Sequence, residues 1–171
     1  ELFNQKIIPS VQPTHATSDM YWLYDRIGKE RAKHAYAYQD LLEKSNVIAF
    51  GTDFPVEDIN PIMTFYSATV RKDKDGYPED GFQIENIMNR TDALQAMTIF
   101  GAYANFEEEE KGSIEFGKDA DFIILDNDIL RSTEARIPNT NVVATFINGE
   151  LVFNRRYNWY MCGIVCAFNI K

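Results

Sequence analysis

A short apolar run stops at a glycine and is followed by a carboxylate in the stretch Val47-Ile48-Ala49-Phe50-Gly51-Thr52-Asp53-Phe54-Pro55-Val56. Such a run is typical of a buried strand that ends in a turn. In an α/β barrel, the reactive groups lie at the C-terminal ends of the strands. Asp53, just past the strand, is therefore a candidate metal ligand or a candidate acceptor for a proton from metal-bound water. The alternative is an aspartate that caps a helix or closes a turn.

The composition excludes several classes of protein. Of 171 residues, 45% are hydrophobic and 25% are charged, as in ordinary globular domains. The net charge of −9 and the lack of a dense basic patch argue against a nucleic-acid partner. No apolar run approaches the roughly 20 residues of a membrane-spanning helix. Two cysteines, Cys162 and Cys166, and two distant histidines argue against a disulfide framework or a metal cluster.

The chain begins with Glu1 inside an expected strand, and we interpret it as a piece of a longer protein. Any N-terminal signal would precede this residue, so its absence here carries no information. The cytoplasm is the expected compartment.

A strand, a helix and a second strand are expected in the first fifty residues. Lys6–Pro13 is a short apolar strand, and the polar segment Thr14–Asp19 follows it as a loop. His15 in that loop could bind substrate, bind a metal or move a proton, although a turn histidine bonded to the backbone is the plainer interpretation. The spacing of apolar residues predicts a helix over Arg26–Lys44, with His34 on its surface. This order is the repeating unit of a parallel α/β architecture.

The rest of the chain changes from helices to strands. A helix is expected from Ile59 to Arg71 with Pro61 in its first turn, and a longer one from Thr91, its cap, to about Phe106. The acidic run Glu107–Glu110 is expected to be the exposed end of that helix. After Lys111, short strands are predicted at 113–116, 121–126, 142–147 and 150–153, the last two joined by the hairpin signal Asn148-Gly149.

Four sequence blocks, in this order, resemble the C-terminal part of the metal-dependent amidohydrolases, in the branch called YtcJ-like or amidohydrolase family 3. The blocks are Ser10-Val11-Gln12-Pro13-Thr14-His15-Ala16-Thr17-Ser18-Asp19-Met20, Phe50-Gly51-Thr52-Asp53-Phe54-Pro55-Val56, Lys111-Gly112-Ser113-Ile114-Glu115-Phe116-Gly117-Lys118-Asp119-Ala120-Asp121-Phe122 and Phe146-Ile147-Asn148-Gly149-Glu150. The resemblance covers nearly everything up to Asn154, and four ordered blocks are far more specific than a single motif.

This resemblance implies a fold and a domain organisation. Residues 7–12 and 47–50 would be strands seven and eight of a TIM-like (β/α)8 barrel, so residues 1–111 would hold the last two βα units. Residues 112–154 would belong to a small β-sandwich, and residues 155–171 would be an apolar tail of uncertain origin. The α/β fold class follows from both the resemblance and the strand–helix–strand order.

The resemblance also implies roles for individual residues. Asp53 would bind the catalytic divalent metal, expected to be zinc, and act as base for the attacking water. His15 would contact the substrate, and Gln12 and Asp19 would line the same pocket. The substrate would be a small-molecule amide or cyclic amide, cleaved at its C–N bond.

The remaining metal ligands of the family, a His-x-His pair and two later histidine strands, are absent from this sequence. A catalytic zinc needs about three protein ligands, so this chain alone is expected to bind metal weakly and to be inactive without the N-terminal part of the barrel. A non-catalytic remnant, or a domain that completes a partner, is the alternative function.

The tail Met161–Asn169 resembles the start of glutamine-hydrolysing asparagine synthetases, whose N-terminal cysteine is the nucleophile; Cys162 is internal here.

Overall fold

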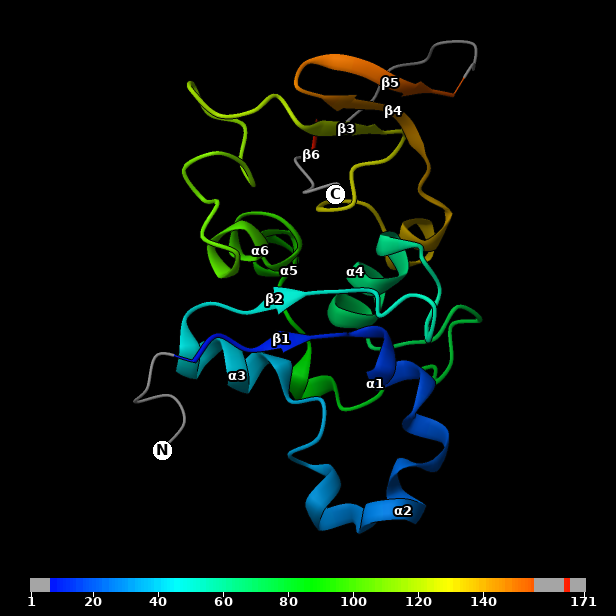
Figure 1. The fold of residues 1–171 in the computed structure, drawn as a ribbon. Coiled ribbons are helices and arrows are strands. Elements are labelled where there is room, and N and C mark those ends of the chain that lie inside the picture. Colours follow the sequence, from blue (N-terminus) through cyan, green and yellow to red (C-terminus); the bar gives the residue numbers. More distant parts are fainter. Residues whose placement is uncertain (1–6, 156–164, 167–171) are drawn as a thin grey trace. The chain divides into compact units, whose positions relative to one another are not determined.

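The computed structural model describes residues 7–155 and 165–166 and has a mixed α/β architecture (Figure 1). The chain divides into two compact units, Glu1–Ala93 and Leu94–Lys171. Of the resemblance in the tail, only Val165 and Cys166 lie within the described residues. Across residues 7–155 and 165–166, no helix has the length and apolar character needed to span a membrane.

The first unit consists of two short strands and several helices. In chain order these are β1 (Ser10–Val11), α1 (Thr14–Ser18), α2 (Met20–Ala32), α3 (Tyr38–Ser45), β2 (Ala49–Phe50), α4 (Pro61–Val70) and the 3-10 turn η2 (Ile84–Asn86), with α5 (Arg90–Met97) beginning at its end. Strands β1 and β2 are parallel neighbours, with Ser10 opposite Ala49 and Val11 opposite Phe50 (Figure 1). The predicted strand–helix–strand unit is therefore present, although each strand is shorter than predicted.

Helix α4 begins as the sequence predicts. The Asn60 side chain accepts a hydrogen bond from the backbone N–H of Ile62, and Pro61 occupies the first turn. Proline is tolerated there because the first N–H groups of a helix have no intrahelical partner. Two hydrogen bonds between side chains join α1 to α4. The hydroxyl groups of Thr17 and Ser67 lie 3.0 Å apart, and those of Thr14 and Thr64 lie 3.4 Å apart. These bonds fix the segment that follows β1.

The single helix predicted over Arg26–Lys44 is wrong. Gly28 has φ +76° and ψ 158°, which kinks α2, and the helix ends at Ala32. A turn then leads to α3, and it contains Tyr36 with φ +55°. The apolar spacing does not reveal this interruption, because Leu23, Ala32 and Tyr36 still face one core with Phe82. His34 is exposed, as expected, but lies in this turn rather than in a helix.

The second unit is built on an antiparallel sheet. Its elements are the last part of α5, α6 (Ile99–Ala104), β3 (Phe122–Leu125), the 3-10 turn η3 (Glu134–Asn139), β4 (Val142–Ile147), β5 (Glu150–Asn154) and β6 (Val165–Cys166). The order of strands is β5-β4-β3-β6. Ile123, Leu125 and Ala144 are buried, whereas every residue of β5 is exposed.

The β4–β5 hairpin is confirmed. Asn148 and Gly149 both have positive φ, +50° and +76°, between the paired residues Ile147 and Glu150. Two consecutive positive φ values match the twist of the flanking strands and favour Asn-Gly. Phe122 and Phe146, paired across β3 and β4, stack with ring centroids 4.5 Å apart.

The predictions for the helix from Thr91 to about Phe106 and for a strand at 113–116 are wrong. The long helix is divided at Thr98, whose backbone leaves the helical region while its hydroxyl bonds to the Leu94 carbonyl at 2.8 Å. Its cap is Asn89, which accepts from the Asp92 N–H, rather than Thr91. Residues 113–116 form bends and turns instead of a strand. The segment does not pair with any described strand. Its Ser113 hydroxyl instead donates a hydrogen bond to Glu115 and accepts one from Lys118 within the same loop.

The acidic run after α6 is only partly exposed. Lys111 lies 3.5 Å from the Glu107 carboxylate, and both side chains are largely buried. The prediction of a fully exposed acidic end is therefore wrong for Glu107, because its charge is balanced by a neighbouring lysine one helical turn away.

Candidate active site

The ends of β1 and β2 bring together residues far apart in the sequence. The two strands are parallel neighbours, and the backbone N–H of Gly51 donates to the Val11 carbonyl at 2.9 Å. The segments that leave their C-terminal ends carry His15 and Asp53. Parallel pairing thus places the two predicted site residues at the same end of the strand pair.

His15 and Asp53 are in direct contact. The Nε2 atom of His15 lies 3.0 Å from Oδ2 of Asp53. Because a carboxylate only accepts, Nε2 carries the proton in this hydrogen bond. The pair is accessible: the Asp53 side chain is 43% exposed and that of His15 is 24% exposed.

The backbone of Asp53 is held in a sparsely populated conformation. Its φ is +60°, in the left-handed region that non-glycine residues rarely adopt. Its carbonyl accepts hydrogen bonds from the N–H groups of Val56 and Glu57, at 2.7 and 3.2 Å. This turn directs the Asp53 carboxylate toward His15, so Asp53 closes a turn, as one of the two interpretations expected, and also faces the second predicted site residue.

The other ring nitrogen of His15 faces two further carboxylates. Its Nδ1 lies 3.8 Å from Asp19 Oδ2 and 4.0 Å from Glu57 Oε1. Ser18 donates a hydrogen bond to Glu57, and Tyr36 donates one to Asp19. The imidazole ring is therefore surrounded by carboxylates on both nitrogens.

A cavity of about 360 Å³ opens beside this pair. It is lined by Val11, Gln12, His15, Tyr36, Tyr38 and Asp53. Three of the predicted site residues thus line one cavity. The fourth, Asp19, stands behind His15 and Tyr36 rather than in the lining.

Sequence reasoning missed Tyr36, Tyr38 and Glu57. Tyr36 and Tyr38 fall within the helix predicted over Arg26–Lys44, but the turn that precedes α3 brings them to the cavity. The Tyr38 hydroxyl donates to the Gln12 carbonyl at 3.0 Å, and burial raises the pKa of Tyr38. Glu57 lies four residues beyond Asp53 in a turn that is not part of a helix, and no pattern in the sequence signals its position.

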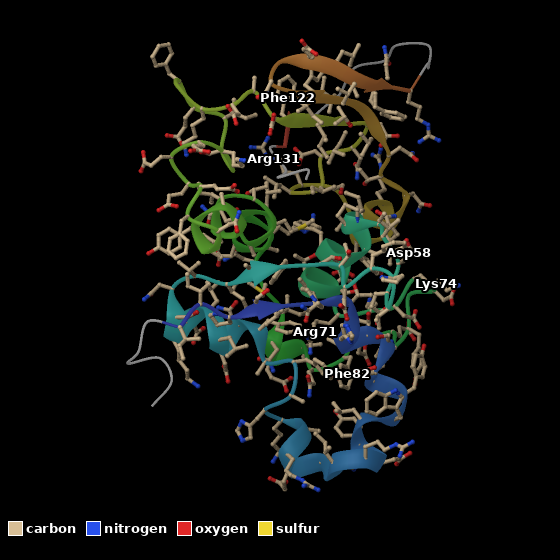
Figure 2. The ribbon with its side chains drawn as sticks, viewed as in Figure 1. Asp58, Arg71, Lys74, Phe82, Phe122 and Arg131 are labelled. Atoms are coloured by element: carbon tan, nitrogen blue, oxygen red, sulfur yellow. The ribbon has the colours of Figure 1, made fainter. Side chains whose placement is uncertain are left out.

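Arg71 supports the cavity wall from inside the first unit, close to Phe82 (Figure 2). Its side chain is fully buried, and its guanidinium lies over the rings of Tyr38 and Phe82 at 5.7 and 5.6 Å. The guanidinium also bonds to the Phe82 carbonyl at 2.8 Å and to Gln83 Oε1 at 2.8 Å. Arg71 thus connects Tyr38, which lines the cavity, to the buried core around Phe82.

The site offers part of a metal-binding set. Asp53 is an accessible carboxylate at a strand end, which suits a divalent cation. Among residues 7–155 and 165–166, however, no group of three or more His, Cys, Asp or Glu side chains is arranged to hold a metal ion. The described residues therefore fit a single metal ligand rather than a complete site.

Comparison with known proteins identifies relatives along most of the chain. Residues 1–153 match the model of a family described as "Amidohydrolase family". The chain is 30% identical to the amidohydrolase YtcJ of Bacillus subtilis (strain 168), over 85% of this chain and 27% of that protein. It is 35% identical to the protein LONG AFTER FAR-RED 3 of Arabidopsis thaliana, over 86% of this chain and 25% of that protein.

A solved structure agrees with these matches. The metal-dependent hydrolase of Pyrococcus horikoshii OT3 superposes with a TM-score of 0.66 at 33% identity, over 78% of this chain and 27% of that one. Two further relatives have names that indicate reactions at C–N bonds. One is a 5-methylthioadenosine/S-adenosylhomocysteine deaminase of Caldanaerobacter subterraneus, 28% identical over 69% of this chain and 28% of that protein. The other is an N-substituted formamide deformylase of Arthrobacter pascens, 25% identical over 70% of this chain and 22% of that protein. The chain spans about a quarter of the length of these proteins.

Proposed function

The chain belongs to the amidohydrolase family, and from this we propose that it is the C-terminal part of a metal-dependent hydrolase that cleaves C–N bonds. In this proposal β1 and β2 are the last two strands of a TIM-like barrel, and the sheet of β3, β4 and β5 belongs to a small β-sandwich. The parallel pairing of β1 with β2 and the structural likeness to a metal-dependent hydrolase support it. A linear or cyclic amide is the proposed substrate class.

Asp53 is the proposed catalytic residue. The observation that carries this role is the 3.0 Å contact between His15 and Asp53 at the ends of two neighbouring parallel strands. Asp53 would take a proton from the attacking water and later give it to the leaving nitrogen, as general base and then general acid. His15 would orient the Asp53 carboxylate and contact the substrate, with Gln12 lining the same cavity.

Asp53 would also be one ligand of a divalent metal, proposed to be zinc. When bound, such an ion supplies Lewis-acid polarisation of the amide carbonyl and a lowered pKa for its water. Since the described residues fit a single ligand, the remaining ligands would come from the N-terminal part of the barrel that the resemblance implies. We accordingly propose that the 171-residue chain alone is inactive.

Activity assays on the complete protein test this function. We expect Asp53→Asn to abolish hydrolysis of N-substituted formamides and cyclic amides, because Asn can neither take nor give the proton. His15→Gln should reduce kcat by about ten- to a hundredfold, the effect of losing a group that orients a catalytic residue. His34→Gln is the control and should leave kcat unchanged, since His34 is exposed and lies outside the cavity lining. Substantial hydrolysis by Asp53→Asn would remove Asp53 from the mechanism.

A further inference from the structure

Tyr36 occupies an unusual position beside the proposed site. It lies in the turn between α2 and α3 with φ +55°, and its side chain lines the same cavity as His15 and Asp53. Its hydroxyl donates a hydrogen bond to Oδ2 of Asp19. Burial, together with this bond to a carboxylate, raises the pKa of Tyr36, so the hydroxyl keeps its proton and remains a donor. The Tyr36 hydroxyl is therefore committed to Asp19.

The oxygen that accepts from Tyr36 is the one that faces His15. Oδ2 of Asp19 lies 3.8 Å from Nδ1 of His15, and Nε2 on the other side of the ring contacts Asp53 at 3.0 Å. The Asp19–His15 separation is longer than a hydrogen bond, so Asp19 acts on the imidazole ring through electrostatics, beside Glu57 at 4.0 Å from the same nitrogen. A path of polar groups thus runs from Tyr36 through Asp19 and His15 to Asp53. Each member lies within unit 1 of the fold.

Asp19 and Tyr36, the first two members of this path, are anchored. Asp19 sits between α1 and α2, and its backbone N–H bonds to the His15 carbonyl at 2.9 Å. The backbone carbonyl of Tyr36 is held by Arg71, and the carbonyl of Ala32 just before the turn accepts from Gln83 Nε2 at 2.6 Å. An anchored hydroxyl limits how far the Asp19 carboxylate can rotate away from Nδ1.

We propose that Tyr36 is a positioning residue that acts through Asp19 to fix the imidazole ring of His15 against Asp53. The inference rests on the proposed function for its catalytic consequence, but the positioning itself concerns only contacts within this chain. Tyr36 does not need to touch the substrate for this role. Its effect is on the orientation of a ring that holds the catalytic carboxylate, in the manner of the outer groups that orient metal and proton ligands.

The first test is nuclear magnetic resonance of the 171-residue chain labelled with ¹⁵N at histidine. The chain has two histidines, so exposed His34 serves as an internal reference for His15. We expect Tyr36→Phe, which removes only the hydroxyl, to shift the Nδ1 and Nε2 signals of His15 and to leave those of His34 in place. Asp19→Asn should shift the same signals, and adding Tyr36→Phe to it should cause little further change.

Tyr38→Phe is the matched control for this measurement. Tyr38 lines the same cavity and also donates a hydrogen bond, but to the backbone carbonyl of Gln12, which accepts from the backbone N–H of His15 at 3.1 Å, rather than to a carboxylate beside the imidazole ring. We expect the His15 signals to stay in place in this variant. The proposal is overturned if Tyr36→Phe leaves the His15 signals unchanged, or if Tyr38→Phe moves them as much as Tyr36→Phe does.

The catalytic consequence is tested in the complete protein. Tyr36→Phe should lower kcat about tenfold and change KM by less than about twofold, because the hydroxyl positions a catalytic group and does not hold substrate. An unchanged kcat would overturn the catalytic role of the path. The two proposals fail separately: a complete protein that hydrolyses no C–N bond removes the proposed function, whereas the resonance experiment still decides whether Tyr36 positions His15.

Discussion

Arg71 donates a hydrogen bond from its guanidinium to the backbone carbonyl of Tyr36, at 3.1 Å, across 35 positions of sequence. The bond holds Tyr36 in its left-handed conformation, from which its ring reaches the cavity. Burial lowers the pKa of Arg71 to about 10, so at neutral pH the guanidinium is charged and its burial opposes folding. Its hydrogen bonds and the two aromatic rings beneath it offset this cost.

Arg71→Lys is expected to destabilise the fold strongly. Lysine keeps a buried charge but presents it as a single ammonium, which cannot reach all three acceptors of the guanidinium. We expect a loss of about 2–4 kcal/mol in the free energy of unfolding, measured by urea denaturation. Arg26→Lys, on the exposed side of α2, should change it by less than about 0.5 kcal/mol. Equal effects of the two substitutions would contradict the anchoring role of Arg71.

The contribution of Asp73 to the free energy of unfolding should decrease as the pH is lowered into the acid range. Partial burial acts to raise the pKa of Asp73, but hydrogen bonds from the Tyr21 hydroxyl and the backbone of Tyr77 and Asp75 outweigh it and lower the pKa below 3.8. A carboxyl whose pKa is lower in the folded state contributes stability above its unfolded pKa and loses it as pH falls through the folded value.

Denaturation of Asp73→Asn at about pH 6 and about pH 2.5 measures this contribution. We expect the variant to be less stable than the original protein at the higher pH, and the difference to shrink at the lower one. Asp80→Asn, at an exposed position of the same loop, is the control and should show no such pH-dependent difference. A difference for Asp73→Asn that is constant with pH would show that its charge does not matter.

Gly112 is required by a close approach as well as by its backbone. Its φ is +88°, and an added Cβ would lie 2.8 Å from Ala102 Cβ and 2.9 Å from Ile99 Cα. Gly117 has a similar φ of +93° but nothing within 4 Å of an added Cβ. Gly117→Ala therefore measures the backbone strain alone, about 1–2 kcal/mol. Gly112→Ala should cost about 1–3 kcal/mol more, and thermal unfolding of both variants tests the difference.

The stacked pair Phe122 and Phe146 should be energetically coupled. Their rings lie at 4.5 Å between centroids with an interplanar angle of 15° on paired positions of β3 and β4. A double-mutant cycle with Phe122→Leu and Phe146→Leu should give a coupling of about 0.5–1.5 kcal/mol. Additive effects of the two substitutions would mean that the rings contribute by burial alone.

The sequence predicted best those features that depend on neighbouring residues. Asn148-Gly149 indicated the hairpin and Pro61 marked the first turn of α4, because each residue type fits a specific backbone conformation. His15 and Asp53 were predicted from their positions after two strands, the resemblance added Gln12, and the parallel pairing brings all three to one cavity. Their proposed chemical roles still await the assays described above.

The features that the sequence did not reveal depend on contacts between distant residues. The break before Tyr36 needs Arg71 to hold a left-handed backbone, and no local pattern specifies that bond. Tyr36 was missed as a site residue for the same reason. Thr98 is an exception, because it divides the predicted long helix through a local bond to the Leu94 carbonyl although the apolar spacing continues through it.

Strand β5 ends the described sheet and exposes Leu151, Val152 and Phe153 by about half of their surface each. A terminal strand has a row of backbone groups that a strand from another molecule can pair with, and adjacent apolar side chains favour such pairing. The charged residues Glu150 and Arg155 bracket this segment and disfavour stacking of identical copies. Concentrated solutions of the chain should therefore aggregate through β5 before any other part of this sheet, and aggregation should be faster when those two charges are removed.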